Sequence, residues 1–128
     1  MLIVDDEPDI RTLLGRIVRE CGFSVAEAGN GEEALAQLAR LEVSLILCNV
    51  RMRGLSGPAF YSVLEQVAPD LSQRVVFCTG DVACADTLKF LRGTGRRVII
   101  KPFEIDEVYQ VLESYAGSPV HVSTKVSL

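Results

Sequence analysis

Short apolar runs recur along the chain, and each is followed by a polar turn and a stretch with helical spacing. The runs occupy residues 2–4, 23–26, 45–48, 75–78 and 98–100. They lack the polar alternation of a half-exposed strand, so they predict strands that are covered on both faces. The segments between them are long enough for helical crossovers, which predicts a repeated strand–helix unit.

The helical stretches begin and end at residues that favour helix termini. After Pro8, apolar residues recur at steps of three and four up to Cys21, and Gly22 ends the pattern. Asn30 is expected to cap a second helix, whose inner face runs to Leu41. Three further helices are expected from Pro58 to Pro69, over residues 83–91 and over residues 104–115.

Strands that alternate with helices predict a doubly wound α/β domain with a five-stranded parallel sheet. Ligands of such sheets bind beyond the carboxyl ends of the strands. The polar residues expected at that edge are Asp5, Asp6, Asn49, Thr79 and Lys101.

Composition narrows the class of protein. A chain of 128 residues with 48% hydrophobic residues has the size of one domain with a real core. The net charge of −4 argues against a nucleic-acid binder, and no segment has the length of a membrane span. We therefore expect a soluble, cytoplasmic protein. The four cysteines lack paired spacing, which predicts free buried thiols, and His121 has no partner that indicates catalysis.

The polar residues at the strand ends have specific chemical uses. Asp5 and Asp6 offer the carboxylates that Mg²⁺ prefers, although acidic residues before Pro8 also simply begin helices. The hydroxyl of Thr79 and the ammonium of Lys101 both donate to phosphoryl oxygens, although Thr79 also serves as an ordinary strand end.

Taken together, these residues resemble a known family. In order and spacing, four motifs resemble the receiver domain of two-component response regulators. They are residues 3–8, the run before Met52 and Gly57, residues 78–80 and residues 101–103. The resemblance covers residues 1–116 and leaves 117–128 as a tail or linker without a clear helix or strand. Residues 79–81 and 95–97 look more particularly like receivers attached to hybrid sensor histidine kinases.

The resemblance implies a phosphorylation switch with a flavodoxin-like strand order of 2-1-3-4-5. A residue at the end of the third strand would accept a phosphoryl group from a histidine kinase or phosphotransfer protein, and Mg²⁺ would neutralise charge. The metal site would consist of Asp6, the residue at position 49 and the carbonyl of Arg51, and Asp5 would act on the metal through water. Thr79 and Lys101 would hold the phosphoryl oxygens, and the Lys101-Pro102 bond would be cis.

The acceptor position departs from this pattern because it holds Asn49. A carboxamide oxygen is neutral and lacks the nucleophilicity of a carboxylate, so ordinary phosphorylation should fail. Loss of one negative charge should also weaken Mg²⁺ binding, while Lys101 could still donate to the amide oxygen. Arg53 stands where proline is usual, and Val98 replaces a common aromatic residue.

Several interpretations stay open. The first is a phosphorylation-deficient receiver, not an enzyme, that binds partners or a second copy through its fourth helix, fifth strand and fifth helix. The second is a working receiver that carries a deliberate Asp-to-Asn substitution at Asn49. A third, from another class, is a small Mg²⁺-dependent phosphohydrolase, and turnover of a phosphate ester would support it. A flavin-binding domain is disfavoured because residues 6–9 would repel a phosphate.

Overall fold

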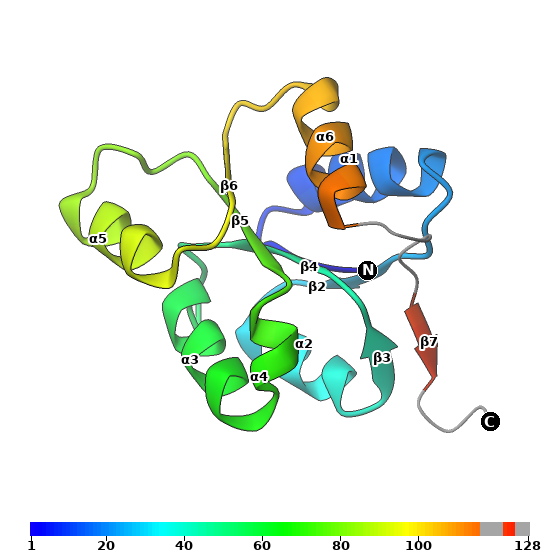
Figure 1. The fold of residues 1–128 in the computed structure, drawn as a ribbon, viewed down its shortest axis with the longest axis horizontal. Coiled ribbons are helices and arrows are strands. Elements are labelled where there is room, and N and C mark those ends of the chain that lie inside the picture. Colours follow the sequence, from blue (N-terminus) through cyan, green and yellow to red (C-terminus); the bar gives the residue numbers. More distant parts are fainter. Residues whose placement is uncertain (116–121, 125–128) are drawn as a thin grey trace.

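A parallel sheet forms the centre of the computed structural model, which describes residues 1–115 and 122–124 (Figure 1). Five strands form this sheet in the order β2-β1-β4-β5-β6, and all neighbouring pairs are parallel. This is the predicted order 2-1-3-4-5, because the additional strand β3 lies outside the sheet. The doubly wound α/β fold is therefore confirmed.

The elements follow one another as strand and helix along the chain. The strands of the central sheet are β1 (Leu2–Val4), β2 (Ala26–Ala28), β4 (Ile46–Asn49), β5 (Val75–Thr79) and β6 (Val98–Ile100). The helices are α1 (Pro8–Glu20), α2 (Gly31–Leu38), α3 (Gly57–Val67), α4 (Pro69–Ser72), α5 (Ala85–Thr94) and α6 (Ile105–Tyr115). A second, antiparallel pair consists of β3 (Leu41–Val43) and β7 (Val122–Thr124).

Helices cover both faces of the sheet, with α1 and α6 on one face and α2, α3 and α4 on the other (Figure 1), where Leu91 of α5 also packs. Successive strand residues point to opposite faces, so each strand contributes to both layers of core. The core under α1 and α6 includes Ile3, Leu47, Val76, Cys78 and Ile99. The core under α2, α3 and α5 includes Leu2, Val4, Ile46, Cys48, Val75 and Phe77. Complete burial of one such aliphatic or aromatic side chain contributes about 1.5–3 kcal/mol.

The second strand is shifted from its predicted position at residues 23–26. β2 begins at Ala26, which pairs with Leu2 of β1. Phe23 and Val25 are partly buried against the core before the strand starts, so they supply apolar contacts from a loop. The apolar run therefore marked packing residues that precede the strand.

The expectation that Leu41 lies on the inner face of the second helix is wrong. Helix α2 ends at Leu38, and Leu41 is the first residue of β3. The expectation of a tail without a strand is also wrong, because Val122–Thr124 form β7 and pair with β3. His121 lies outside the described residues.

The predicted helix ends are close to the observed ones. Asn30 caps α2 as predicted, since its side-chain oxygen accepts from the backbone nitrogen of Glu33 at 2.8 Å. Helix α5 runs from Ala85 to Thr94 instead of over 83–91, and it ends at Gly95, whose φ of 66° is a left-handed cap. Within the described residues, no helix combines the length and apolar character that a membrane crossing requires.

Two expectations about burial need correction. Strand β6 is an edge strand that buries Ile99 and exposes 37% of Val98 and 51% of Ile100, so it is covered on one face only. All four cysteines are free, as predicted, and Cys48 and Cys78 are buried. Cys21 and Cys84 are partly exposed, contrary to prediction.

Candidate functional site

The residues predicted at the strand ends lie at the same edge of the sheet. Asp5 and Asp6 follow β1, Asn49 is the last residue of β4, Thr79 is the last residue of β5, and Lys101 follows β6. Asp5, Asn49 and Thr79 are nearly inaccessible to solvent. Parallel strands present these ends side by side, so the fold concentrates their polar groups at one place.

Asp5 is the most heavily bonded of these residues. Its Oδ2 accepts from the Lys101 ammonium at 2.9 Å, and its Oδ1 accepts from the backbone nitrogen of Glu7 at 2.9 Å. The Arg11 guanidinium donates to its carbonyl oxygen at 2.7 Å. Only 1% of the Asp5 side chain is exposed, so its charge depends on these donors instead of on water.

The Asn49 amide has a defined orientation. Its Oδ1 accepts from the backbone nitrogen of Val50 at 3.0 Å, and its Nδ2 donates to the carbonyl oxygen of Arg51 at 2.9 Å. The same nitrogen lies 3.5 Å from Oδ1 of Asp5 and 3.5 Å from Oδ1 of Asp6. The acceptor position thus presents a donor to the acidic pair.

Lys101 and Thr79 do not contact the Asn49 amide among the hydrogen bonds of the described residues. Lys101 pairs with Asp5 and lies 3.7 Å from the Glu7 carboxylate, and the amide oxygen of Asn49, to which it could donate, accepts from Val50 instead. Thr79 Oγ1 accepts from the backbone nitrogen of Asp81 at 3.0 Å. The Lys101-Pro102 bond is cis, as the resemblance implied.

Close backbone packing positions the loop that follows Asn49. The backbone nitrogen of Gly57 donates to the Val50 carbonyl at 2.9 Å. A Cβ atom at Gly57 would lie 2.5 Å from the Asn49 carbonyl oxygen, so a side chain there would push α3 away from the end of β4. Ser56 caps α3 by accepting from the backbone nitrogen of Ala59.

The side chain of Arg51 joins two loops at the site, which sequence reasoning missed. Its Nε lies 2.9 Å from the Asp81 carboxylate, and that carboxylate also accepts from the Thr87 hydroxyl at 3.2 Å. The guanidinium also contacts Cys84 Sγ at 4.0 Å. Opposite charges at positions 51 and 81 were the only sequence signal, because the pairing depends on the path of both loops.

The cysteine thiols differ in acidity according to their surroundings. Burial raises the pKa of Cys78 to about 12, and the same desolvation raises the pKa of Cys48 above its ordinary value. Hydrogen bonds from Thr87 and Asp86 at the start of α5 lower the pKa of Cys84. Cys84 is thus the thiol most ready to ionise among those whose pKa is shifted.

The acidic cluster supplies oxygen donors of the kind that a hard divalent cation requires. Carboxylate oxygens of Asp5, Asp6 and Glu7 lie within 4.8 Å of one another, with Asp5 buried and Glu7 exposed. The Asn49 amide nitrogen, which lies near the carboxylates of Asp5 and Asp6, also donates to the carbonyl oxygen of Arg51. Asn49 does not fit such an ion, because it turns its amide nitrogen, a donor, toward these oxygens.

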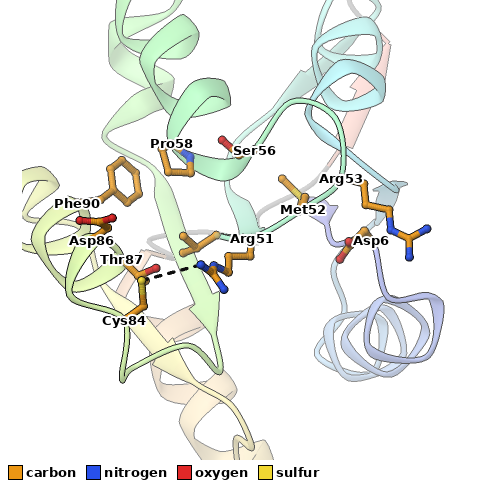
Figure 2. A pocket seen from close by; sticks show the side chains of 11 residues that line it. Asp6, Arg51, Met52, Arg53, Ser56, Pro58, Cys84, Asp86, Thr87 and Phe90 are labelled. Atoms are coloured by element: carbon orange, nitrogen blue, oxygen red, sulfur yellow. Dashed lines mark hydrogen bonds between the residues drawn. The ribbon is translucent and has the colours of Figure 1, made fainter.

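A cavity of about 530 Å³ opens beside the acceptor position, as Figure 2 shows. One side is lined by Asp6, Arg51 and Arg53. The other side is lined by Thr87 and Phe90 of α5 and by Cys84, the residue before this helix. Arg51 reaches across the opening toward Cys84 (Figure 2). The cavity therefore lies between Asp6, the loop that follows β4 and the start of α5.

Comparison with known proteins gives consistent results. The family model described as "Response regulator receiver domain" matches residues 1–113. The transcriptional regulatory protein ZraR of Salmonella typhimurium is 30% identical over 88% of this chain, and the chemotaxis protein CheY of Listeria monocytogenes is 29% identical over 91% of it. The matched region covers 97% of that CheY protein but only 25% of ZraR, so the chain spans about a quarter of such longer relatives.

Solved structures show the same fold. The receiver domain of NtrX from Brucella abortus has a TM-score of 0.78 and 30% identity, with 89% of this chain and 95% of that chain covered. The signal receiver domain of an HD domain-containing protein from Pseudomonas fluorescens has a TM-score of 0.81 at 22% identity, with 89% and 90% covered. The chain therefore belongs to the response regulator receiver domain family of two-component signalling.

Proposed function

We propose that this receiver does not accept a phosphoryl group in the usual way and acts as a protein interaction module. The observation that carries the proposal is Asn49 at the end of β4, where both polar atoms of the amide are engaged by backbone groups. A neutral carboxamide cannot form an acyl phosphate as a carboxylate does. The natural pseudo-receiver, instead of a deliberate substitution, is favoured by Arg53 and Val98, which also depart from the family pattern.

The partner in this proposal is a sensor histidine kinase or a phosphotransfer protein, since these are the usual partners of receivers. The contact surface consists of α5, β6 and α6, where Val98, Ile100 and Ile105 are exposed, together with the exposed Val82 in the loop before α5. An edge strand with exposed apolar side chains is a surface that association covers. A homodimer through the same elements is the alternative occupant. We also propose that the chain is a receiver attached to a hybrid sensor kinase, because residues 79–81 and 95–97 resemble those of such receivers.

The proposed module binds Mg²⁺ more weakly than a receiver with an acceptor aspartate, because one carboxylate is missing from the acidic cluster. It turns over no substrate and contacts no nucleic acid directly. The proposal assigns a phosphoryl-type site around Asn49 to residues at one edge of the sheet, namely Asp5, Asp6, the carbonyl of Arg51, Thr79 and Lys101.

The test is incubation of the purified chain with acetyl phosphate and Mg²⁺, followed by intact-mass analysis. The proposal predicts no phosphoryl adduct at any incubation time. A stable adduct on the chain, removed when Asn49 is replaced by alanine, would overturn it. Hydrolysis of para-nitrophenyl phosphate measured in the same samples tests the phosphohydrolase alternative, and turnover that depends on Asp6 would support that alternative.

A further inference from the structure

The orientation of the Asn49 amide is determined by two backbone partners. A backbone nitrogen, that of Val50, donates to Oδ1, and a carbonyl oxygen, that of Arg51, accepts from Nδ2. Turning the amide by half a rotation would place nitrogen against nitrogen and oxygen against oxygen. Both hydrogen bonds would be lost in a side chain of which only 6% is exposed, so the observed orientation is strongly preferred.

The amide nitrogen faces three oxygen atoms at once. They belong to the Arg51 carbonyl at 2.9 Å and to the carboxylates of Asp5 and Asp6 at 3.5 Å each. These are the same groups that a receiver of this family would offer to Mg²⁺. We infer that the Asn49 amide takes the place of the divalent cation, so that this receiver holds its acidic site in a metal-free form.

Two cationic side chains support this arrangement. Lys101 lies 2.9 Å from Asp5 and 3.7 Å from Glu7, which compensates the buried carboxylate. Arg53 lines a cavity of about 400 Å³ together with Asp6, Glu7 and Asp9, and Figure 2 shows it next to Asp6. The protein's own hydrogen-bond donors and positive charges thus surround the acidic cluster.

This inference rests on the proposed function and makes it more specific. Loss of one carboxylate by itself would only weaken Mg²⁺ binding in proportion to the missing charge. Replacement of the cation by an amide donor adds an obstacle, because Mg²⁺ must first displace or turn the amide. The two explanations differ in what happens when the amide is removed without adding a charge.

The Asn49→Ala variant separates the two explanations. If the amide occupies the cation's place, this variant binds Mg²⁺ about tenfold or more tightly than the unmodified chain, measured by isothermal titration calorimetry. If a missing ligand is the whole cause, the variant binds Mg²⁺ no better than the unmodified chain, and that result would overturn the inference. Asn30→Ala is the matched control, because it also removes an amide side chain, here the cap of α2, and should leave Mg²⁺ binding unchanged.

A second measurement uses the unmodified chain, so the test does not depend on how the variant folds. Asn30 and Asn49 are the only asparagines in the sequence, so labelling asparagine side chains with ¹⁵N gives two amide signals. Millimolar Mg²⁺ should leave both signals in place. A saturable shift of the Asn49 signal would contradict the inference.

Each proposal fails on a different observation. Tight Mg²⁺ binding by the unmodified chain without a phosphoryl adduct would overturn the metal-free site and leave the proposed function intact. A phosphoryl adduct on the unmodified chain would overturn the proposed function itself.

Discussion

The side-chain nitrogen of Asn49 lies 2.9 Å from the carbonyl oxygen of Arg51. A carboxylate at position 49 could not make this contact, because both groups would be acceptors. The contact therefore reverses the hydrogen-bonding role of the acceptor position, from an oxygen that attracts cations to a nitrogen that donates. It explains how a receiver pocket with a complete set of neighbouring residues is stable without the acceptor carboxylate.

Removal of the Lys101 ammonium should strongly destabilise the fold. Asp5 is 1% exposed and Lys101 is 14% exposed, so Lys101→Met leaves a buried carboxylate without its cation. The expected loss is about 3 kcal/mol of unfolding free energy, measured by urea denaturation. Combining Lys101→Met with Asp5→Asn should recover part of this loss. Losses that simply add in the double variant would show that the two groups do not interact.

Two valines provide a matched test of the core. Val76 is completely buried in the sheet, whereas 69% of Val67 at the end of α3 is exposed. Val76→Ala should lower the free energy of unfolding by about 2–3 kcal/mol, because it removes buried methyl groups and leaves a cavity. Val67→Ala should change it by less than about 0.5 kcal/mol. Equal effects in urea denaturation would contradict the position of β5 in the sheet.

The buried thiols predict a loss of stability at alkaline pH. The pKa of Cys78 is raised to about 12 and that of Cys48 is raised as well, from an ordinary value of 9.0. Above pH 9 the unfolded chain therefore loses thiol protons that the folded chain keeps, so stability falls as the pH rises toward 12. Urea midpoints of a variant with alanine at both positions should fall less steeply over this range, whereas Cys84→Ala should not reduce the slope. Identical slopes for the double variant and the unmodified chain would exclude these thiols as the cause.

Cys84 should react first with an alkylating reagent. It is partly exposed, and hydrogen bonds at the start of α5 lower its pKa, whereas Cys48 and Cys78 are buried with raised pKa values. Brief treatment of the folded chain with iodoacetamide, followed by peptide mapping, should therefore label Cys84 well before the two buried thiols. Labelling of Cys48 at the same rate in the folded chain would show that its surroundings are open to solvent.

Sequence patterns predicted most of the fold because burial on both faces requires apolar runs. β1, which is buried on both faces, begins and ends where the run at 2–4 does. β6 also matches its run at 98–100, although only Ile99 of this strand is buried. The prediction failed where a partly buried apolar residue did not belong to the expected element. Phe23 packs from a loop, and Leu41 lies in a short strand that pairs with residues far along the chain. Local spacing carries no signal for either arrangement.

The site could be predicted only as a set of residues. Asp5, Asn49, Thr79 and Lys101 each end or follow a strand, and a parallel sheet brings such positions together. The pairing of Lys101 with Asp5 and the direction of the Asn49 amide each depend on a contact of 2.9 Å between groups that are not adjacent in the sequence. Those distances follow from packing, so sequence spacing does not reveal them.

The central claim is that Asn49 alone prevents phosphorylation in an otherwise assembled site. The most direct measurement is the intact mass of Asn49→Asp after incubation with acetyl phosphate and Mg²⁺, beside the unmodified chain and Asn30→Asp. The account predicts one phosphoryl group on Asn49→Asp and none on the other two samples. An adduct on the unmodified chain, or no adduct on a folded Asn49→Asp variant, would contradict it.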